Sequence, residues 1–171
     1  MRSCMAVIAA LSALAGCAGP VRTHFGAQSG AAESLALQTI AVSPSDQTDA
    51  RWPALAAAIG REGFRVDASS PYQLEFAFGT RSARTAILGE QNAVLAPAKR
   101  QRLLQSCADR DYRLVVTVVD NRNGDLVRRG WAQESHCHGT SAEALPALAN
   151  QAVAMLARPV AAGSDLRRAR D

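Results

Sequence analysis

The chain has 171 residues, a formal net charge of +4 and 19 basic side chains, nearly all of them arginine. These arginines are spread along the whole sequence, and this distribution argues against a nucleic-acid partner. The residues after an apolar N-terminal segment are numerous enough for one domain with a hydrophobic core. Aromatic residues make up only 5% of the chain, so we expect a core of valine, leucine, isoleucine and alanine.

The N-terminus has a short basic start, an apolar run from Met5 to Ala15 and the sequence Leu14-Ala15-Gly16-Cys17. This layout is typical of a bacterial secretory signal with a lipobox. The thiol of Cys17 lies at the edge of the apolar segment, where it can reach a lipid donor, and small residues before it admit the peptidase. The apolar run is about half of the roughly 20 residues that a membrane-spanning helix needs.

The N-terminal segment therefore resembles the signals of bacterial lipoproteins. The resemblance implies that residues 1–16 are a signal peptide and that Cys17 carries acyl chains such as palmitate. In such proteins an Asp directly after the lipidated cysteine tends to retain the protein in the inner membrane. This chain has Ala18 at that position, which implies a lipid anchor in the outer membrane and a protein that faces the periplasm.

Residues 17–34 are expected to form the lipidated cysteine and a flexible tether, because they are small, polar and glycine-rich. The folded domain is predicted to span residues 35–158. It begins with a loosely alternating strand, Leu35–Val42, and a helix, Asp49–Arg61. That helix has one apolar face at positions i, i+3, i+4 and i+7.

The clearest predicted strand is Tyr72–Thr80, in which apolar and polar residues alternate. Period-two alternation indicates an antiparallel sheet with one packed face and one wet face. The pattern weakens over residues 81–101. There Ile87–Leu88 and Val94–Leu95 are either short strands or parts of a loop, and residues 102–107 could form another strand.

A hairpin is predicted from Tyr112–Val119, an Asn-Gly turn near Gly124 and the return strand Leu126–Gln133. Both faces of the first strand carry valine, so we expect a central strand that is covered on both sides. The register stays open between a two-residue turn and a three-residue bulged turn. A slip of one residue would exchange the valine row that faces Trp131.

The last predicted helix begins at Thr140, which has capping-box spacing to Glu143, and runs to about Ala157. Pro159 ends it, and residues 159–171 are expected to be a disordered basic tail. This order of elements predicts an α+β fold: a mainly antiparallel sheet with two helices packed on one face.

Short motifs also resemble a group of small periplasmic lipoproteins that carry a domain of unknown function. They are Gly63-Phe64 after a helix, Ser69-Ser70-Pro71 before an alternating strand, and Leu126-Val127-Arg128-Arg129-Gly130 in the return strand. The return strand of the group usually reads Leu-Val-Trp-Arg-Gly, so Arg128 departs from it. The resemblance implies a fold and no known activity.

Cysteine counting predicts one disulfide. Cys4 leaves with the signal and Cys17 takes the lipid, which leaves Cys107 and Cys137 as an even pair in an oxidising compartment. The neighbouring sequence Ser135-His136-Cys137-His138 invites a metal hypothesis. In a strand, however, His136 and His138 would share one face and Cys137 would point to the other. We therefore expect no metal site and no cofactor.

No Gly-x-Ser-x-Gly elbow, phosphate loop or recognisable carboxylate pair is present in the sequence, and residues such as Glu75 and Glu134 are interpreted as solvated. We therefore expect a non-catalytic protein. The first hypothesis is an envelope binding or assembly module with a protein or glycan partner. The alternative is a small-ligand or metal-binding lipoprotein, which convergent His136 and His138 or a closed apolar pocket would favour.

The candidate partner patch is Arg128, Arg129 and Trp131, because arginine and tryptophan are enriched where interfaces bind tightly. A basic sheet face that exposes Arg113, Arg128 or Arg129 beside Trp131 would favour the binding module. The competing interpretation is that Trp131 belongs to the core and the arginines are merely solvated.

Overall fold

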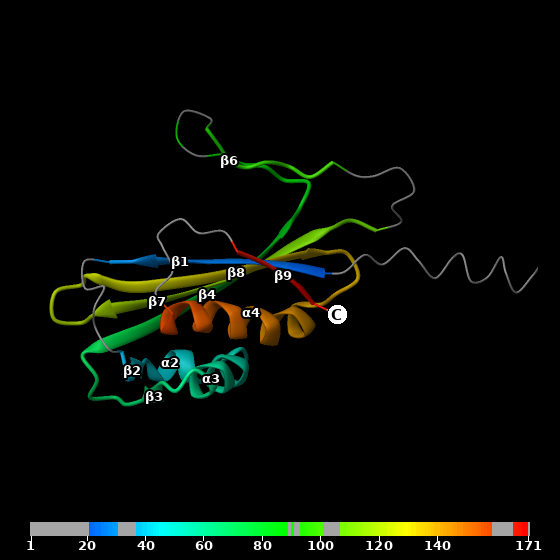
Figure 1. The fold of residues 1–171 in the computed structure, drawn as a ribbon. Helices are drawn as coiled ribbons and strands as arrows, with labels where there is room; N and C mark the ends of the chain where they lie inside the picture. Colours follow the sequence, from blue (N-terminus) through cyan, green and yellow to red (C-terminus); the bar gives the residue numbers. More distant parts are fainter. Residues whose placement is uncertain are drawn as a thin grey trace, which may run out of the picture.

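A computed structural model describes residues 21–30, 37–88, 90, 93–100 and 107–158, and residues 166–170 by their backbone. Its main element is a seven-stranded sheet in the order β3-β2-β4-β7-β8-β1-β9 (Figure 1). The strands of this sheet are β1 (Val21–Ser29), β2 (Thr39–Val42), β3 (Arg65–Val66), β4 (Tyr72–Ser82), β7 (Arg110–Asp120), β8 (Leu126–His136) and β9 (Leu166–Arg170).

Two helices, α3 (Trp52–Arg61) and α4 (Ser141–Ala157), lie on the same side of the sheet (Figure 1). The pairs β4–β7, β7–β8, β8–β1 and β1–β9 are antiparallel, whereas β2 runs parallel to β3 and β4. The expected α+β fold, with a mainly antiparallel sheet and two helices on one face, is confirmed. A single-turn helix, α2 (Pro44–Gln47), follows β2 where the sequence predicts only a break.

The core lies between the sheet and the two helices. Its fully buried members include Leu74 from the alternating strand, and Leu55 and Ile59 from the apolar face of α3. Helix α4 contributes many small residues to the same layer, and the fully buried ones among them are Ala144, Ala149 and Ala152. The prediction of a core built from aliphatic residues and alanine is therefore confirmed.

The predicted capping box at the start of α4 is formed. The Thr140 hydroxyl accepts a hydrogen bond from the Glu143 backbone N–H, and the Glu143 carboxylate accepts one from the Thr140 N–H. These two bonds satisfy donors that the first turn of a helix leaves without partners.

None of the helices in the described part of the chain combines the length and the apolar composition that spanning a bilayer requires.

The expected tether is wrong over residues 21–29, which form strand β1. This strand pairs with β8 over the seven residues from Thr23 to Ser29. Thr23, Phe25 and Ala27 alternate into the buried face, so the segment does carry a period-two pattern, which its glycines and polar residues conceal. The expected signal peptide, Cys17 and residues 31–34 lie outside the described residues.

The expected disordered tail is also corrected. Residues Leu166–Arg170 form β9, which pairs antiparallel with β1 in the register Val21 to Arg170. Backbone hydrogen bonds to the edge of β1 account for this strand, because the tail sequence itself has no packing pattern. Residues 159–165 lie outside the described part of the chain.

The hairpin between β7 and β8 has a longer turn than either expected type. Val119 pairs with Leu126, and the register shifts between Val118 and Val119. The buried valines, Val116 and Val118, face the helices, and the other row, which includes Val115, faces the side of Trp131 and is only half-buried. The expectation that β7 is covered on both faces is therefore wrong for the described residues.

The weakly patterned stretch forms a separate two-stranded arm, made of β5 (Ile87–Leu88) and β6 (Val94–Ala96), which stands off the main sheet (Figure 1). Both of the short strands that the sequence left open therefore exist. Residues 102–106, which were expected to form a strand with Cys107, lie outside the described residues, and Cys107 itself is not in a strand.

Candidate functional site

The sheet face opposite the helices carries Trp131 and two of its neighbouring arginines. Trp131 pairs with Val115 across the hairpin, and Arg113 lies one pair further along the same face. The Arg113 guanidinium carbon lies over the indole ring, 4.9 Å from its centroid. This is a cation–π contact between two side chains of neighbouring strands. No described helix covers this face.

Arg129 completes this surface. It pairs with Thr117, and its Nε donates to the Thr117 hydroxyl oxygen at 3.3 Å. Arg113 and Arg129 are both exposed, and Trp131 is half-buried and absent from the hydrophobic core. We call Arg113, Arg129 and Trp131 the outer-face patch.

Charge is concentrated beside this patch. Although the Arg113 residue is exposed, partial desolvation lowers its pKa, and the positive charge of Arg81 lowers this pKa further. Arg81 itself forms an ion pair with Asp111, at 2.6 Å between Nη2 and Oδ2. Asp111 is buried and also accepts a hydrogen bond from Ser135. The carboxylate of Asp111 is thus engaged by Arg81 and Ser135.

Arg128 does not belong to the patch that the sequence predicted. Its Nη1 donates to the carbonyl oxygen of Leu156, in the last turn of α4, at 2.6 Å. Successive residues of a strand point to opposite faces, so Arg128 faces the helices while Arg129 and Trp131 face outward. Of the predicted patch residues, Arg129 and Trp131 therefore lie on the outer face and Arg128 does not. Arg113, which the sequence analysis named as a possible neighbour of Trp131, lies beside it.

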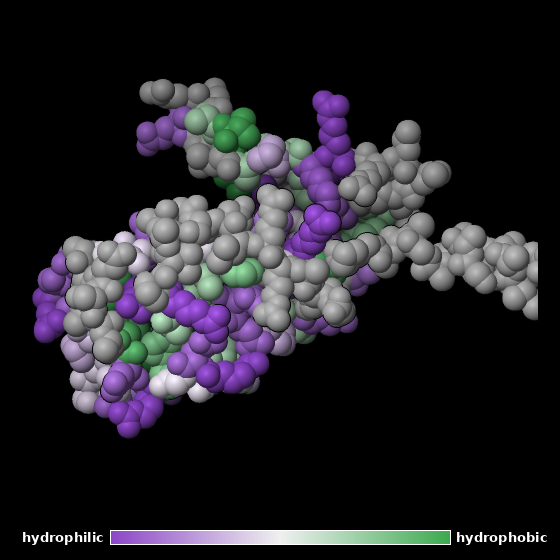
Figure 2. Space-filling model, viewed as in Figure 1, coloured by the Kyte–Doolittle hydropathy of each residue, from purple (hydrophilic) through white to green (hydrophobic). Residues whose placement is uncertain are grey.

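A second exposed feature is the β5–β6 arm. Ile87, Leu88 and Val94 expose 43%, 54% and 61% of their surfaces. Figure 2 shows hydrophobic residues on this arm above a more polar body. Single exposed apolar residues are ordinary, but three on one projecting hairpin form a contiguous apolar element.

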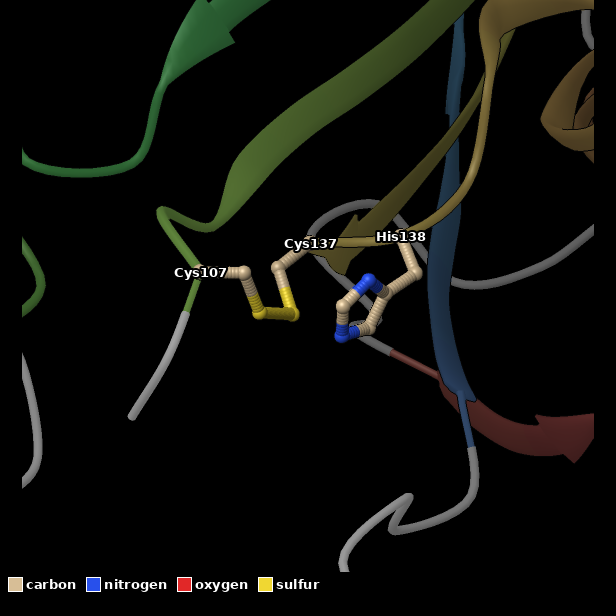
Figure 3. Close-up of side chains that lie close together, drawn as sticks. All are labelled: Cys107, Cys137 and His138. Carbon is tan, nitrogen blue, oxygen red and sulfur yellow. A yellow bond between two sulfur atoms is a disulfide. The ribbon is translucent and has the colours of Figure 1, made fainter. Parts of the chain in front are cut away.

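Cys107 and Cys137 are joined by a disulfide, with their Cα atoms 5.6 Å apart (Figure 3). Cys107 precedes β7 and Cys137 follows β8, so the bond links adjacent strands at one end of the sheet. The Cα separation lies within the usual range for a bridge.

The two histidines beside Cys137 have separate environments. Strand β8 ends at His136, whose ring stacks on Tyr112 with the centroids 4.8 Å apart. His136 Nδ1 accepts a hydrogen bond from the Gly139 N–H at 3.0 Å. His138 follows the end of the strand, and its ring lies beside the disulfide (Figure 3). The expectation that both histidines share one face fails because the strand does not continue to His138.

His138, Cys107 and Cys137 form a cluster whose ligand atoms all lie within 4.8 Å of one another. The cysteines are half-buried and His138 is exposed. Sequence reasoning missed this grouping because it assumed a continuous strand. Convergence of His136 with His138, which would have favoured a histidine-pair metal site, is not what the structure shows.

Glu134 is fully buried, in contrast to the solvated position expected for it. Its Oε1 accepts a hydrogen bond from the Thr23 hydroxyl at 2.8 Å, and its Oε2 lies 3.7 Å from Nε2 of His136. Because Nδ1 of His136 accepts from Gly139, a neutral ring carries its proton on Nε2, on the side of Glu134. The hydrogen bond from Thr23 thus ties Glu134 of β8 to β1.

No protein-family model and no curated protein matches the chain. The fold is similar to that of a PDZ domain protein from Parabacteroides distasonis, with a TM-score of 0.51 and 9% identity. That match covers 94% of this chain and 42% of the other, so this chain spans less than half of that protein. At this identity the likeness concerns the fold alone.

Weaker similarities were found to two further bacterial proteins. A PelC dodecamer from Paraburkholderia phytofirmans matches with a TM-score of 0.47 and 11% identity, covering 81% of this chain and 99% of that one. A minor lipoprotein from Acinetobacter baumannii matches with a TM-score of 0.34 and 17% identity, covering 72% and 88%. Neither likeness is close enough to bear on the function of this chain.

Proposed function

We propose that the protein is a lipoprotein of the outer membrane that faces the periplasm and binds an envelope protein or glycan without catalysing a reaction. The lipobox that ends at Cys17 supports the anchor. The connection between the lipidated cysteine and the folded domain would be short, because β1 begins at Val21, four residues after Cys17. Four extended residues span at most about 14 Å, so the anchor would hold the domain close to the bilayer.

The outer-face patch is the observation that carries the binding role. Arg113 and Trp131 are pre-stacked at 4.9 Å on a sheet face that no described helix covers. Ordering them in advance reduces the entropy lost when a partner binds. Arginine and tryptophan are also the side chains that contribute most often to tight interfaces. The exposed arm supplies a second, apolar contact.

Crosslinking in the native envelope tests the patch. The double variant Arg113→Ser with Arg129→Ser should lose the principal crosslinked partner. The matched control is Arg65→Ser with Arg158→Ser, which removes the same charge from exposed positions outside the patch. Unchanged crosslinks in the patch variant, or an equal loss in the control, would reject the patch as the binding surface.

Two measurements test the anchor and the absence of catalysis. The membrane-extracted protein should have the intact mass of an acylated chain that begins at Cys17, and Cys17→Ser should abolish lipid labelling. An unmodified Cys17, or a chain that still begins at Met1, would refute the anchor. Turnover of an envelope substrate by the purified domain would refute the non-catalytic role.

A further inference from the structure

We propose that Cys107, Cys137 and His138 form a redox-gated site for monovalent copper, which opens when the disulfide is reduced. The site is assembled by the fold from separate parts of the chain. Cys107 precedes β7, whereas Cys137 and His138 follow β8. Their two sulfurs and one imidazole nitrogen all lie within 4.8 Å of one another (Figure 3).

The framework that holds these ligands does not depend on the disulfide alone. Arg110 pairs with His136 in the β7–β8 ladder, which places both cysteines at the same end of two hydrogen-bonded strands. Once the bond is broken, the two thiols stay adjacent because the ladder and the 5.6 Å Cα separation bring them together. Reduction therefore leaves two thiols and one imidazole in place.

His136 positions His138 and is not itself a ligand. Its ring is fixed by the stacking on Tyr112 and by the hydrogen bond from Gly139. A Cβ at Gly139 would stand 1.6 Å from Cε1 of His136, so the chain bends tightly around this ring. The bend ends the alternation of β8 and turns His138 toward the sulfur atoms.

The donor set selects the metal. Thiolates are soft ligands that favour Cu(I) and zinc, whereas carboxylates and carbonyls suit harder ions. Zinc is four-coordinate in proteins, so with the three protein ligands of this cluster it would need a water as its fourth ligand. Cu(I) is satisfied by three soft ligands, so two thiolates and one neutral imidazole complete its coordination. We therefore expect this three-ligand set to bind Cu(I) more tightly than zinc, which would need a water to complete its coordination.

The gating step is a thiol–disulfide exchange with an external dithiol. A thiolate of the reductant attacks one sulfur of the bridge, the bond between Cys107 and Cys137 breaks, and a mixed disulfide forms. The second thiol of the reductant displaces the remaining cysteine. The reductant leaves as its own disulfide, and the protein gains two electrons and two protons as a pair of thiols.

Copper then binds without any change in oxidation state. Cu(I) displaces the protons of Cys107 and Cys137 as the two thiolates coordinate it, and a ring nitrogen of neutral His138 supplies the third ligand. Two protons are released for each ion bound. The disulfide and the metal complex are mutually exclusive because each cysteine binds the metal as a thiolate, and the S–S bond leaves neither cysteine as a thiolate.

The test uses the full chain with Cys4→Ser and Cys17→Ser, so that Cys107 and Cys137 are the remaining thiols. The dithiol-reduced protein is titrated with Cu(I) under anaerobic conditions against a chromophoric chelator. We expect one Cu(I) per reduced chain and none on the oxidised chain. X-ray absorption should show two sulfur ligands and one nitrogen ligand.

The variant His138→Ala keeps both thiols and should bind Cu(I) at least about tenfold more weakly, since losing a ligand costs no less than losing an outer-shell partner. His24→Ala, which removes an imidazole from β1, is the matched control and should retain full affinity. Equal affinity in His138→Ala, no binding to the reduced chain, or tighter binding of zinc than of Cu(I) would overturn the proposal.

Circular dichroism measures whether the reduced chain remains folded, with and without Cu(I). A reduced chain that stays folded, or that refolds when Cu(I) is added, supports a site built on the sheet. A reduced chain that is unfolded both with and without Cu(I) overturns the proposal, because the ligands would then have no framework.

Discussion

Gly130 in β8 lies directly against the backbone of Ala152 in α4. A Cβ at Gly130 would stand 2.1 Å from the Ala152 carbonyl oxygen, and both residues are buried. The helix can approach the sheet this closely because the facing side chains are small. Part of the high alanine content is therefore a packing requirement of α4.

Gly130→Ala should lower the free energy of unfolding by about 1–3 kcal/mol, because the added methyl forces the helix away from the sheet. Urea denaturation measures the effect. Gly79→Ala is the matched control: it also lies in a strand, and a Cβ there has nothing within 4 Å. Equal stability of the two variants would show that the close approach is not a constraint.

The neighbouring residues Arg128 and Arg129 should have different roles. Arg128 donates to the Leu156 carbonyl, one of the acceptors that the end of a helix leaves without a partner. Arg128→Ala should therefore reduce stability by about 1 kcal/mol. Arg129→Ala, at an exposed position, should change stability by less than about 0.5 kcal/mol. The reverse order of effects would contradict the assignment of Arg128 to the helix side.

Several elements of the fold were predictable because their signals are local. The strand around Leu74 is defined by alternation within itself, and α4 is defined by a cap at Thr140 that lies within four residues of its partner. The hairpin follows from two adjacent valine-rich and apolar segments and a Gly124 turn, whose φ of 77° suits glycine.

Strands β1 and β9 were not predictable in this way. In β1, Thr23 pairs with Glu134, which is 111 residues away in the sequence. Strand β9 is formed by pairing with the edge of β1. Neither segment is apolar enough to indicate a strand alone. Long-range backbone pairing therefore determines the structure of these two segments, which the sequence patterns predicted to be a tether and a tail.

The candidate sites show the same limit. Alternation alone could have separated Arg128 from Trp131, since residues three apart in a strand face opposite ways. The contact of Arg113 with Trp131 needed the hairpin register, and the approach of His138 to the disulfide needed the end of β8. The hairpin register and the end of β8 both depend on turn geometry, which several residues determine together.

Reducing the Cys107–Cys137 bond should destabilise the domain by about 3–4 kcal/mol, since the bond closes a loop with a sequence separation of 30. Urea denaturation with and without a dithiol measures the loss. Thiol titration of the denatured, unreduced protein should find no free thiol at these two positions. Free thiols there, or stability unaffected by the dithiol, would contradict a structural contribution of the bond.

The turn between β7 and β8 should give the domain part of its acid sensitivity. Asp120 accepts hydrogen bonds from the Arg122 backbone N–H at 3.0 Å and from its Nε at 2.9 Å. The Arg122 side-chain bonds, then its backbone bond, lower the pKa of Asp120 from 3.8 to about 2. A carboxyl whose pKa is lowered by folding stabilises the folded state when ionised. This contribution is present above pH 3.8 and is lost as the pH falls through about 2.

Arg122→Ala should therefore raise the pKa of Asp120 toward its ordinary value, with the backbone hydrogen bond retaining part of the shift. NMR titration of the carboxyl carbon follows this change directly. The pKa of Asp67, which hydrogen bonds from Ser69 lower, should stay unchanged and serves as the internal control. The variant should also lose less stability than the parent between pH 3.8 and about 2, because it has less charge-assisted bonding to lose. An unchanged Asp120 titration in Arg122→Ala would show that the side-chain bonds do not set this pKa.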